Sequence, residues 1–489
     1  MRRAHGPRFD RGVPHHRQGG AFAIMAALLL IVVIAFCGLA IDVGRLYNRK
    51  VELSGIAKAA AIAAARELNG TADGITNARS SAKAAAERLI YGFALPVVWN
   101  DRALSFSAAP DRSGTWAPST SSGQPDTLFY AKVDTAGLSE QTGTVESLFM
   151  HVLSPALASA QVFESAIAGR TGVNIAPIAI CAMSTSGATE RSNAGASSTE
   201  LVEYGFRRGV NYDLMQLNPA TTSAARYLVN PVAAPGAAFA PIDRASMAPF
   251  VCSGRMWVPT VLGGAIRVSS LPESKPLEAI FTQLNSRFDD FNGECNPNGA
   301  PPDFNVKPYV YTSPSELKWM DPKSGRASAL GTIVRGRLET IADLPTAPAG
   351  TLATDYGPLW SYAKAVQYAA SEPRSGYLTF ATGDWPSLYK LGPKVGAYTT
   401  ASATPYKATS GATYEAPRPD NREMSTEQRR VLQVPLLECP VASGTDVAAS
   451  VTGVGRFFMT VRATSDSLIA EFAGAATPAS LKGQVELFP

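Results

Sequence analysis

The stretch AFAIMAALLLIVVIAFCGLAIDVGRLYNRKVELSGIAKAAAIAAAREL, residues 21–68, decides the fold. Its first part, residues 21–41, carries no charge, and as an α-helix it spans about 31 Å, the hydrocarbon thickness of a bilayer. Asp42 and Arg45 mark the expected membrane exit. The helical spacing then continues without proline to Leu68, and Asn69-Gly70 gives a stop signal. The sequence therefore predicts one long helix, which lies in lipid at first and then forms an Ala-rich stem. Ala60 and Ala64 belong to a stripe of small residues on that stem, which we expect to face a partner.

The residues before the apolar run set the expected orientation. Five arginines stand against one aspartate in residues 1–19, so the positive-inside rule places this tail in the cytoplasm and the bulk of the chain across the membrane. A lipoprotein signal is disfavoured because Phe36 precedes Cys37, and the apolar run is longer than the core of a secretory signal. A prepilin signal would need a Glu five residues after Gly20, where Met25 stands. We therefore expect a retained single-pass anchor.

Composition describes the region beyond the membrane. A length of 489 residues allows two or three domains. The charged fraction of 17% is low, and Gly, Pro, Ser, Thr and Ala are plentiful, which favours a β-rich extracytoplasmic protein with long loops. The net charge of +4, with no Lys/Arg run among aromatics, gives no sign of nucleic-acid binding.

The chain order predicts an α+β fold in four parts: a tail at 1–19, a transmembrane helix and stem at 20–70, a small pilin-like α+β head at 71–181, and a β-rich domain at 182–489. In the head, a helix at 77–91 should form a hairpin with the stem. A short helix is expected at 147–153, and strands at 104–107, 128–133, 161–168 and 173–180. In the last part we expect a linker at 184–199, a helix at 277–290, an exposed loop at 395–420, and strands at 201–206, 257–261, 266–268, 307–311, 377–380, 432–437 and 457–461.

The cysteines predict disulfides. Cys181, Cys252, Cys295 and Cys439 all follow the apolar run, and an even number outside the membrane favours two bridges. Cys181 and Cys439 each end an apolar run, and the other two bracket one subregion, so we favour the pairs 181–439 and 252–295. The other pairings and four free thiols remain open. Zinc is disfavoured because no cysteine stands in a CxxC pair.

No catalytic motif is present, and neither a cofactor, a metal site nor a small-molecule substrate is predicted. His151 lies in an apolar stretch and is interpreted as a core or boundary residue. Asp111, with Ser113 and Thr115, is interpreted as a turn, since a Gly/Pro/Ser-rich loop surrounds it. The pairs Asp289-Asp290 and Arg429-Arg430 are interpreted as solvated charges, and the six tryptophans as packing residues.

At this point the residues suggest a family. The block RQGGAFAIMAALLL…GLAIDVGRLYNRKVELSGIAKAAAIAAARELNG resembles the TadG-like and TadE-like proteins of tight-adherence (Flp, type IVc) pilus systems. Those proteins share an apolar helix, an Asp-x-Gly-Arg exit and an Ala-rich helix; VNIAPIAIC (173–181), LNSRFDDF (284–291) and RRVLQVPLLEC (429–439) also look similar. Lys58 departs from the pattern, which has Asp there.

The resemblance implies a bitopic protein of the bacterial inner membrane, a structural component of a pilus assembly or secretion system and not an enzyme. The Ala-rich helix would then bind other Tad/Flp components, and a large charged residue at Ala60 or Ala64 should abolish assembly. The alternative is a membrane-tethered adhesin or ligand-binding module, whose β-rich domain recognises a surface through loops such as 395–420.

Overall fold

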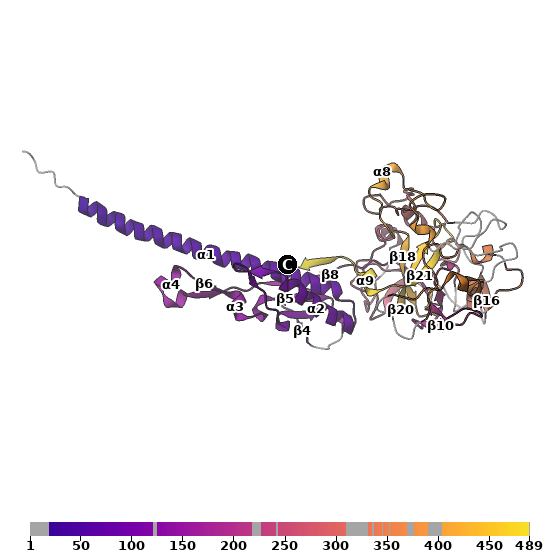
Figure 1. The fold of residues 1–489 in the computed structure, drawn as a ribbon, viewed down its shortest axis with the longest axis horizontal. Coiled ribbons are helices and arrows are strands. Elements are labelled where there is room, and N and C mark those ends of the chain that lie inside the picture. Colours follow the sequence, from indigo (N-terminus) through magenta and orange to yellow (C-terminus); the bar gives the residue numbers. More distant parts are fainter. Residues whose placement is uncertain are drawn as a thin grey trace, which may run out of the picture.

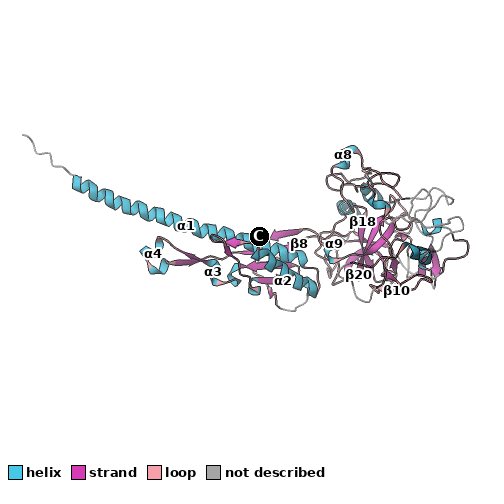
Figure 2. Ribbon diagram, viewed as in Figure 1, coloured by secondary structure: helices cyan, strands magenta, loops and turns pink. Residues whose placement is uncertain are grey.

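The structure is a computed structural model that describes residues 19–120, 125–217, 226–240, 243–309, 331–334, 337–344, 346–351, 353–368, 376–389 and 403–488. The expected tail lies outside these residues, apart from Gly19. The molecule is elongated: one long helix carries a small head, and a larger unit rich in strands lies beyond the head (Figure 1). We call this larger unit the distal unit. Strands are its main regular elements, joined by long loops (Figure 2), so the predicted α+β class with a β-rich C-terminal region is confirmed.

The predicted long helix is confirmed as α1 (Gly19–Glu67), a continuous helix of 49 residues. After a short turn, α2 (Ala72–Glu87) runs back beside it. This second helix begins earlier than the expected residue 77 because Thr71 caps it: the Thr71 hydroxyl accepts a hydrogen bond from the Gly74 N–H at 3.1 Å.

The head is an antiparallel five-stranded sheet with α1 and α2 packed on it. Small side chains from both helices fill the core together with Phe106, Ala131 and Ala168 of the sheet. The strand order is β22 (Val485–Phe488), β8 (Ser165–Arg170), β5 (Tyr130–Asp134), β3 (Leu104–Ser107) and β4 (Ala117–Pro118). The head is thus completed by a strand that follows the distal unit in sequence.

Residues 144–161, which we call the arm, leave the head and run along α1 toward the N-terminal end of that helix (Figure 1). Two short antiparallel strands, β6 (Thr144–Glu146) and β7 (Ser159–Gln161), form its base. Its tip holds α4 (Met150–Leu153) and a 3₁₀ turn, Pro155–Leu157. One helical turn, α3 (Glu140–Gly143), precedes the arm.

An eight-stranded mixed sheet organises the distal unit. Its order is β13 (Asn211–Asp213), β21 (Ile469–Ala475), β20 (Val451–Met459), β18 (Val431–Leu437), β9 (Ile178–Cys181), β14 (Arg226–Val229), β15 (Ile266–Ser270) and β19 (Val447–Ala449). The expected head ended at residue 181, but β9 pairs with β14 and β18 here. The sheets thus divide the chain near Arg170, because β9 needs partners from the distal strands.

The remaining described elements are small. The strands are β1 (Ile90–Tyr91), β2 (Leu95–Pro96), β10 (Thr189–Arg191), β11 (Glu200–Glu203), β12 (Phe206–Arg207), β16 (Gly331–Val334) and β17 (Arg337–Thr340). The helices are α5 (Ala248–Ser253), α6 (Phe281–Asn285), α7 (Trp385–Leu388), α8 (Pro419–Arg422) and α9 (Pro478–Leu481). The expected linker at 184–199 contains β10, and no continuous strand forms at 257–261 or 377–380. The expected strand at 307–311 lies partly outside the described residues, and its described part is loop.

Two interpretations of charged pairs are wrong. Arg430 is fully buried: its guanidinium donates hydrogen bonds to four backbone carbonyls and lies 4.3 Å from the Phe288 ring centre. Asp289 is 4% exposed, because the helix expected at 277–290 ends before it. Its carboxylate accepts hydrogen bonds from the Arg418 N–H and the Asn421 amide, both at 2.6 Å. Both residues therefore join segments that are distant in sequence.

The loop expected to be exposed at 395–420 is exposed in part. Residues 395–402 lie outside the described residues, and 10 of the 18 residues at 403–420 are exposed, but Tyr406 anchors this segment in the distal unit. Tyr406 is 5% exposed, donates its hydroxyl to Asp303 at 3.2 Å, and contacts Tyr309 and Phe458 in a small core. Deleting this loop would therefore damage the distal fold, and such a deletion cannot test surface recognition by itself.

Candidate functional site

The stem part of α1 has two opposite faces. One face is buried: Ala57, Ala60, Ala61 and Ala64 all have no exposed surface and lie in the core of the head. The expectation that Ala60 and Ala64 face a partner protein is therefore wrong. Small residues recur here because they let α2 and the sheet approach the stem closely, so the stripe serves the chain's own fold.

The other face of the stem is uncovered, and we call it the open face. It carries Val43, Tyr47 and Val51, whose exposed fractions are 51%, 66% and 54%. Gly55 and Lys58 continue this face and are also exposed. A Cβ atom added at Gly55 would meet nothing within 4 Å, although glycine inside a helix is unfavourable by about 1 kcal/mol relative to alanine. Within the described chain, packing gives no reason for glycine at that position.

The predicted membrane-exit residue Asp42 holds the arm against α1. Its residue exposure is 2%, and its carboxylate accepts hydrogen bonds from three successive backbone N–H groups. These belong to Leu148, Phe149 and Met150, at 2.8, 2.9 and 2.8 Å. A carboxylate that accepts several backbone N–H bonds is a strong, charge-assisted anchor. Asp42 thus fixes the position of α4 at the tip of the arm.

Two arginines of α1 bind the base of the arm. The Arg45 guanidinium donates a hydrogen bond to the Glu146 carbonyl at 2.9 Å. Arg49 donates to the carbonyl of Thr142 at 2.9 Å and to that of Thr144 at 3.3 Å. Asp42, Arg45 and Arg49 therefore form a ladder along α1 that ties the arm to the helix.

Gly38 and Phe149 complete this contact, and neither was predicted from the sequence. Gly38 is the one buried position among residues 22–41, and an added Cβ would lie 2.6 Å from Cβ and Cγ of Phe149. Gly38 and Asp42 are four residues apart and so share one side of the helix. That spacing was visible in the sequence, but its partner lies more than a hundred residues away in the chain.

The structure joins the cysteines in the two pairs that the sequence analysis favoured. Cys181 bonds Cys439, with their Cα atoms 5.6 Å apart. Because β9 and β18 run parallel with Cys181 opposite Leu437, the ends of both strands meet at one edge of the sheet. Cys37 is free and exposed on α1.

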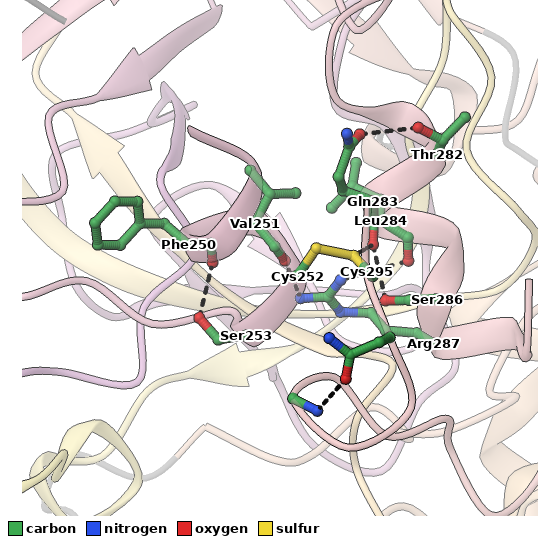
Figure 3. The surroundings of a disulfide bond; sticks show 12 residues. Phe250, Val251, Cys252, Ser253, Thr282, Gln283, Leu284, Ser286, Arg287 and Cys295 are labelled. Atoms are coloured by element: carbon green, nitrogen blue, oxygen red, sulfur yellow. Dashed lines mark hydrogen bonds between the residues drawn. A yellow bond between two sulfur atoms is a disulfide. The ribbon is translucent and has the colours of Figure 1, made fainter. Parts of the chain in front are cut away.

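The second pair, Cys252–Cys295, links the end of α5 to the loop after α6. Figure 3 shows the buried Arg287 beside this bridge, where its guanidinium donates to the Val251 carbonyl at 3.0 Å. Burial, followed by the nearby charge of Arg429, lowers the pKa of Arg287 well below its usual value. The cluster of carbonyls and arginines fits a structural role for this bridge.

The remaining candidates have structural surroundings. His151 is exposed on α4, in contrast to the expected core or boundary position, and its Nδ1 lies 3.2 Å from the Ser147 carbonyl oxygen. Asp111 accepts hydrogen bonds from the N–H and the hydroxyl of Ser113 at 2.9 and 2.8 Å, as in an Asx turn. Across the part of the chain that the structure describes, no three His, Cys, Asp or Glu side chains gather as metal ligands would.

The long apolar helix defines the class of this chain. Among the described residues, α1 alone is long and apolar enough to cross a membrane, which suggests a single-pass membrane protein. Residues 20–67 match the family described as Tad, putative Flp pilus-assembly TadE/G-like. The expected resemblance is confirmed over this segment, and the match supports a role in Flp pilus assembly. Comparisons with curated proteins and with solved structures gave no match.

Proposed function

We propose that this chain is a bitopic, non-catalytic component of a Tad/Flp-type pilus assembly or secretion system in the bacterial inner membrane. Its N-terminal tail would be cytoplasmic, and the head and distal unit would lie in the periplasm or at the cell surface. The observation that carries this proposal is the open face of the stem, an exposed apolar strip on the segment that matches the family.

The geometry of the open face suits helix packing. From Val43 to Gly55 it extends about 18 Å beyond the apolar run, at 1.5 Å per residue. Helices pack at 8–10 Å when small residues lie at the contact, and Gly55 leaves room for such an approach. Because the head covers the opposite side of the stem, a partner helix from another pilus component has one side of α1 to bind.

The test is a charge placed on the open face. Val51→Glu should leave membrane insertion and folding intact, because Val51 is 54% exposed, but it should abolish pilus assembly and cross-linking to other Tad components. Val98→Glu is the matched control, since Val98 is 62% exposed and belongs to the head, outside α1. Normal assembly by Val51→Glu would contradict the proposal, as would equal defects in both variants.

A second candidate function rests on a cleft in the distal unit. The cleft encloses about 680 Å³, and its lining includes Phe304, Tyr362, Lys364 and Arg456. The lining also includes Lys407, and cationic side chains such as Lys364 and Lys407 attract an anionic surface or ligand, as an adhesin would need. Lys364→Glu should then reduce attachment to an anionic surface while pilus number stays normal. Unchanged attachment would count against this function.

A further inference from the structure

The tip of the arm, residues 147–157, is unusual for a surface segment. Between Ser147 and Leu157 it has no Lys, Arg, Asp or Glu. Four of its apolar side chains are exposed: Leu148 by 54%, Phe149 by 41%, Val152 by 77% and Leu157 by 40%. Soluble proteins rarely expose such a cluster without a function for it. The tip therefore presents apolar surface that nothing in the described chain covers.

The position of the tip relative to α1 indicates what covers it. Phe149 packs on Gly38, which lies within the apolar run of residues 21–41. Gly38 precedes Asp42 by one helical turn, so the tip reaches about 6 Å below the level of Asp42 along the helix. Residues 22–41 are exposed in the structure except for Gly38, and lipid would cover them in a membrane. The apolar surface of the tip is continuous with this lipid-covered surface.

The polar contacts that hold the arm on α1 also agree with a position at the membrane boundary. Asp42 satisfies three backbone N–H groups at the start of α4, and Arg45 and Arg49 bind the carbonyls of Glu146 and Thr144 at the base of the arm. Unpaired backbone polar groups are costly near hydrocarbon. These contacts pair backbone groups at the tip and at the base, and leave side chains such as Val152 directed outward.

We propose that the arm is a membrane-contacting element, whose tip inserts Leu148, Phe149 and Val152 into the boundary between lipid headgroups and acyl chains. Apolar faces of interfacial segments lie about 5–10 Å deep in that boundary, which agrees with the level of Gly38. A single helix leaves its tilt and rotation free, whereas a second contact beside it restricts both. The arm would thereby set the direction in which the open face points. This inference rests on the proposed membrane anchoring of α1.

The experiment uses the full chain reconstituted in vesicles of phosphatidylethanolamine and phosphatidylglycerol. Val152→Cys in a Cys37→Ser background provides one reactive thiol, because the other four cysteines are bonded in pairs. Val232→Cys in the same background is the matched control, since Val232 is 58% exposed in the distal unit. The chain with native Cys37 reports whether α1 itself lies in lipid. Each thiol carries a fluorophore, and nitroxide-labelled lipids serve as the quencher.

The proposal predicts a several-fold stronger quenching at residue 152 than at residue 232, together with a blue-shifted emission. Strong quenching at Cys37 with none at residue 152 would overturn the proposal while leaving the anchor intact. Absence of quenching at Cys37 would instead overturn the proposed anchoring, and the inference with it. If residue 152 is shielded only in native membranes that contain the other pilus components, a protein partner covers the tip and the lipid proposal is wrong.

Discussion

Replacing Ala64 by leucine tests whether the Ala-rich stripe serves the chain's own fold. Ala64 has no exposed surface and lies in the core of the head. Leucine adds three carbon atoms, and overpacking of this kind costs about 1–3 kcal/mol. For a loss of about 2 kcal/mol, the fraction of open molecules rises about 30-fold. Amide hydrogen exchange in α2 should accelerate by about that factor, because α2 packs on this face of α1.

Hydrogen exchange with mass spectrometry resolves the effect by region. In Ala64→Leu, the exchange rate of peptides from β20 in the distal unit should be unchanged. Lys58→Leu on the open face is the control variant. It should change exchange in α2 by less than about threefold, since most surface substitutions alter stability within ±0.5 kcal/mol. Unchanged exchange in α2 together with loss of pilus assembly in Ala64→Leu would contradict an internal role for the stripe. That result would return the stripe to the role expected from the sequence, a surface for a partner.

Three further predictions follow from other contacts. Asp42→Asn places an amide against three N–H donors, which weakens the contact that holds the arm against α1. Chymotrypsin should then cleave residues 144–161 faster, while cleavage of the distal unit is unchanged. Burial raises the pKa of Glu471 from 4.5 to about 7. The protonated side chain therefore makes its full contribution to the free energy of unfolding below about pH 4.5. About 3 kcal/mol of that free energy should be lost as pH rises through 7. Urea unfolding at pH 5 and pH 8 measures this loss, and Glu471→Gln should remove it. Replacing both Cys181 and Cys439 by alanine should lower the free energy of unfolding by about 5 kcal/mol, because the bridge spans a sequence separation of 258 residues. Urea unfolding followed by tryptophan fluorescence should show a lower midpoint.

The sequence predicts local features of this fold well. α1 was predictable because a long run without charge or proline continues into small helix formers, and Asn69-Gly70 marks its end. Which face of the stem is buried was not predictable, because alanine suits both a partner contact and an internal core.

Two of the missed contacts share one physical cause. Arg430 looked solvated in the sequence, yet its partners are backbone carbonyls from two other segments, and every residue type has such a carbonyl. Asp42 looked like a simple exit marker for the same reason, since its partners are backbone N–H groups in the arm. Side-chain patterns do not report contacts that are made to the backbone.

The pairing of β22 with β8 has a consequence for how the protein is made. Thr171 and Gln484, which follow β8 and precede β22, are hydrogen-bonded although 313 residues separate them. At about 5–20 residues per second, the ribosome needs roughly 15–60 s to synthesise that interval. Until then β8 is paired only with β5, and its other side is an unpaired strand edge that can act as a template for aggregation. Chains that stop early would carry this edge permanently, so the last strand protects the head as well as completing it.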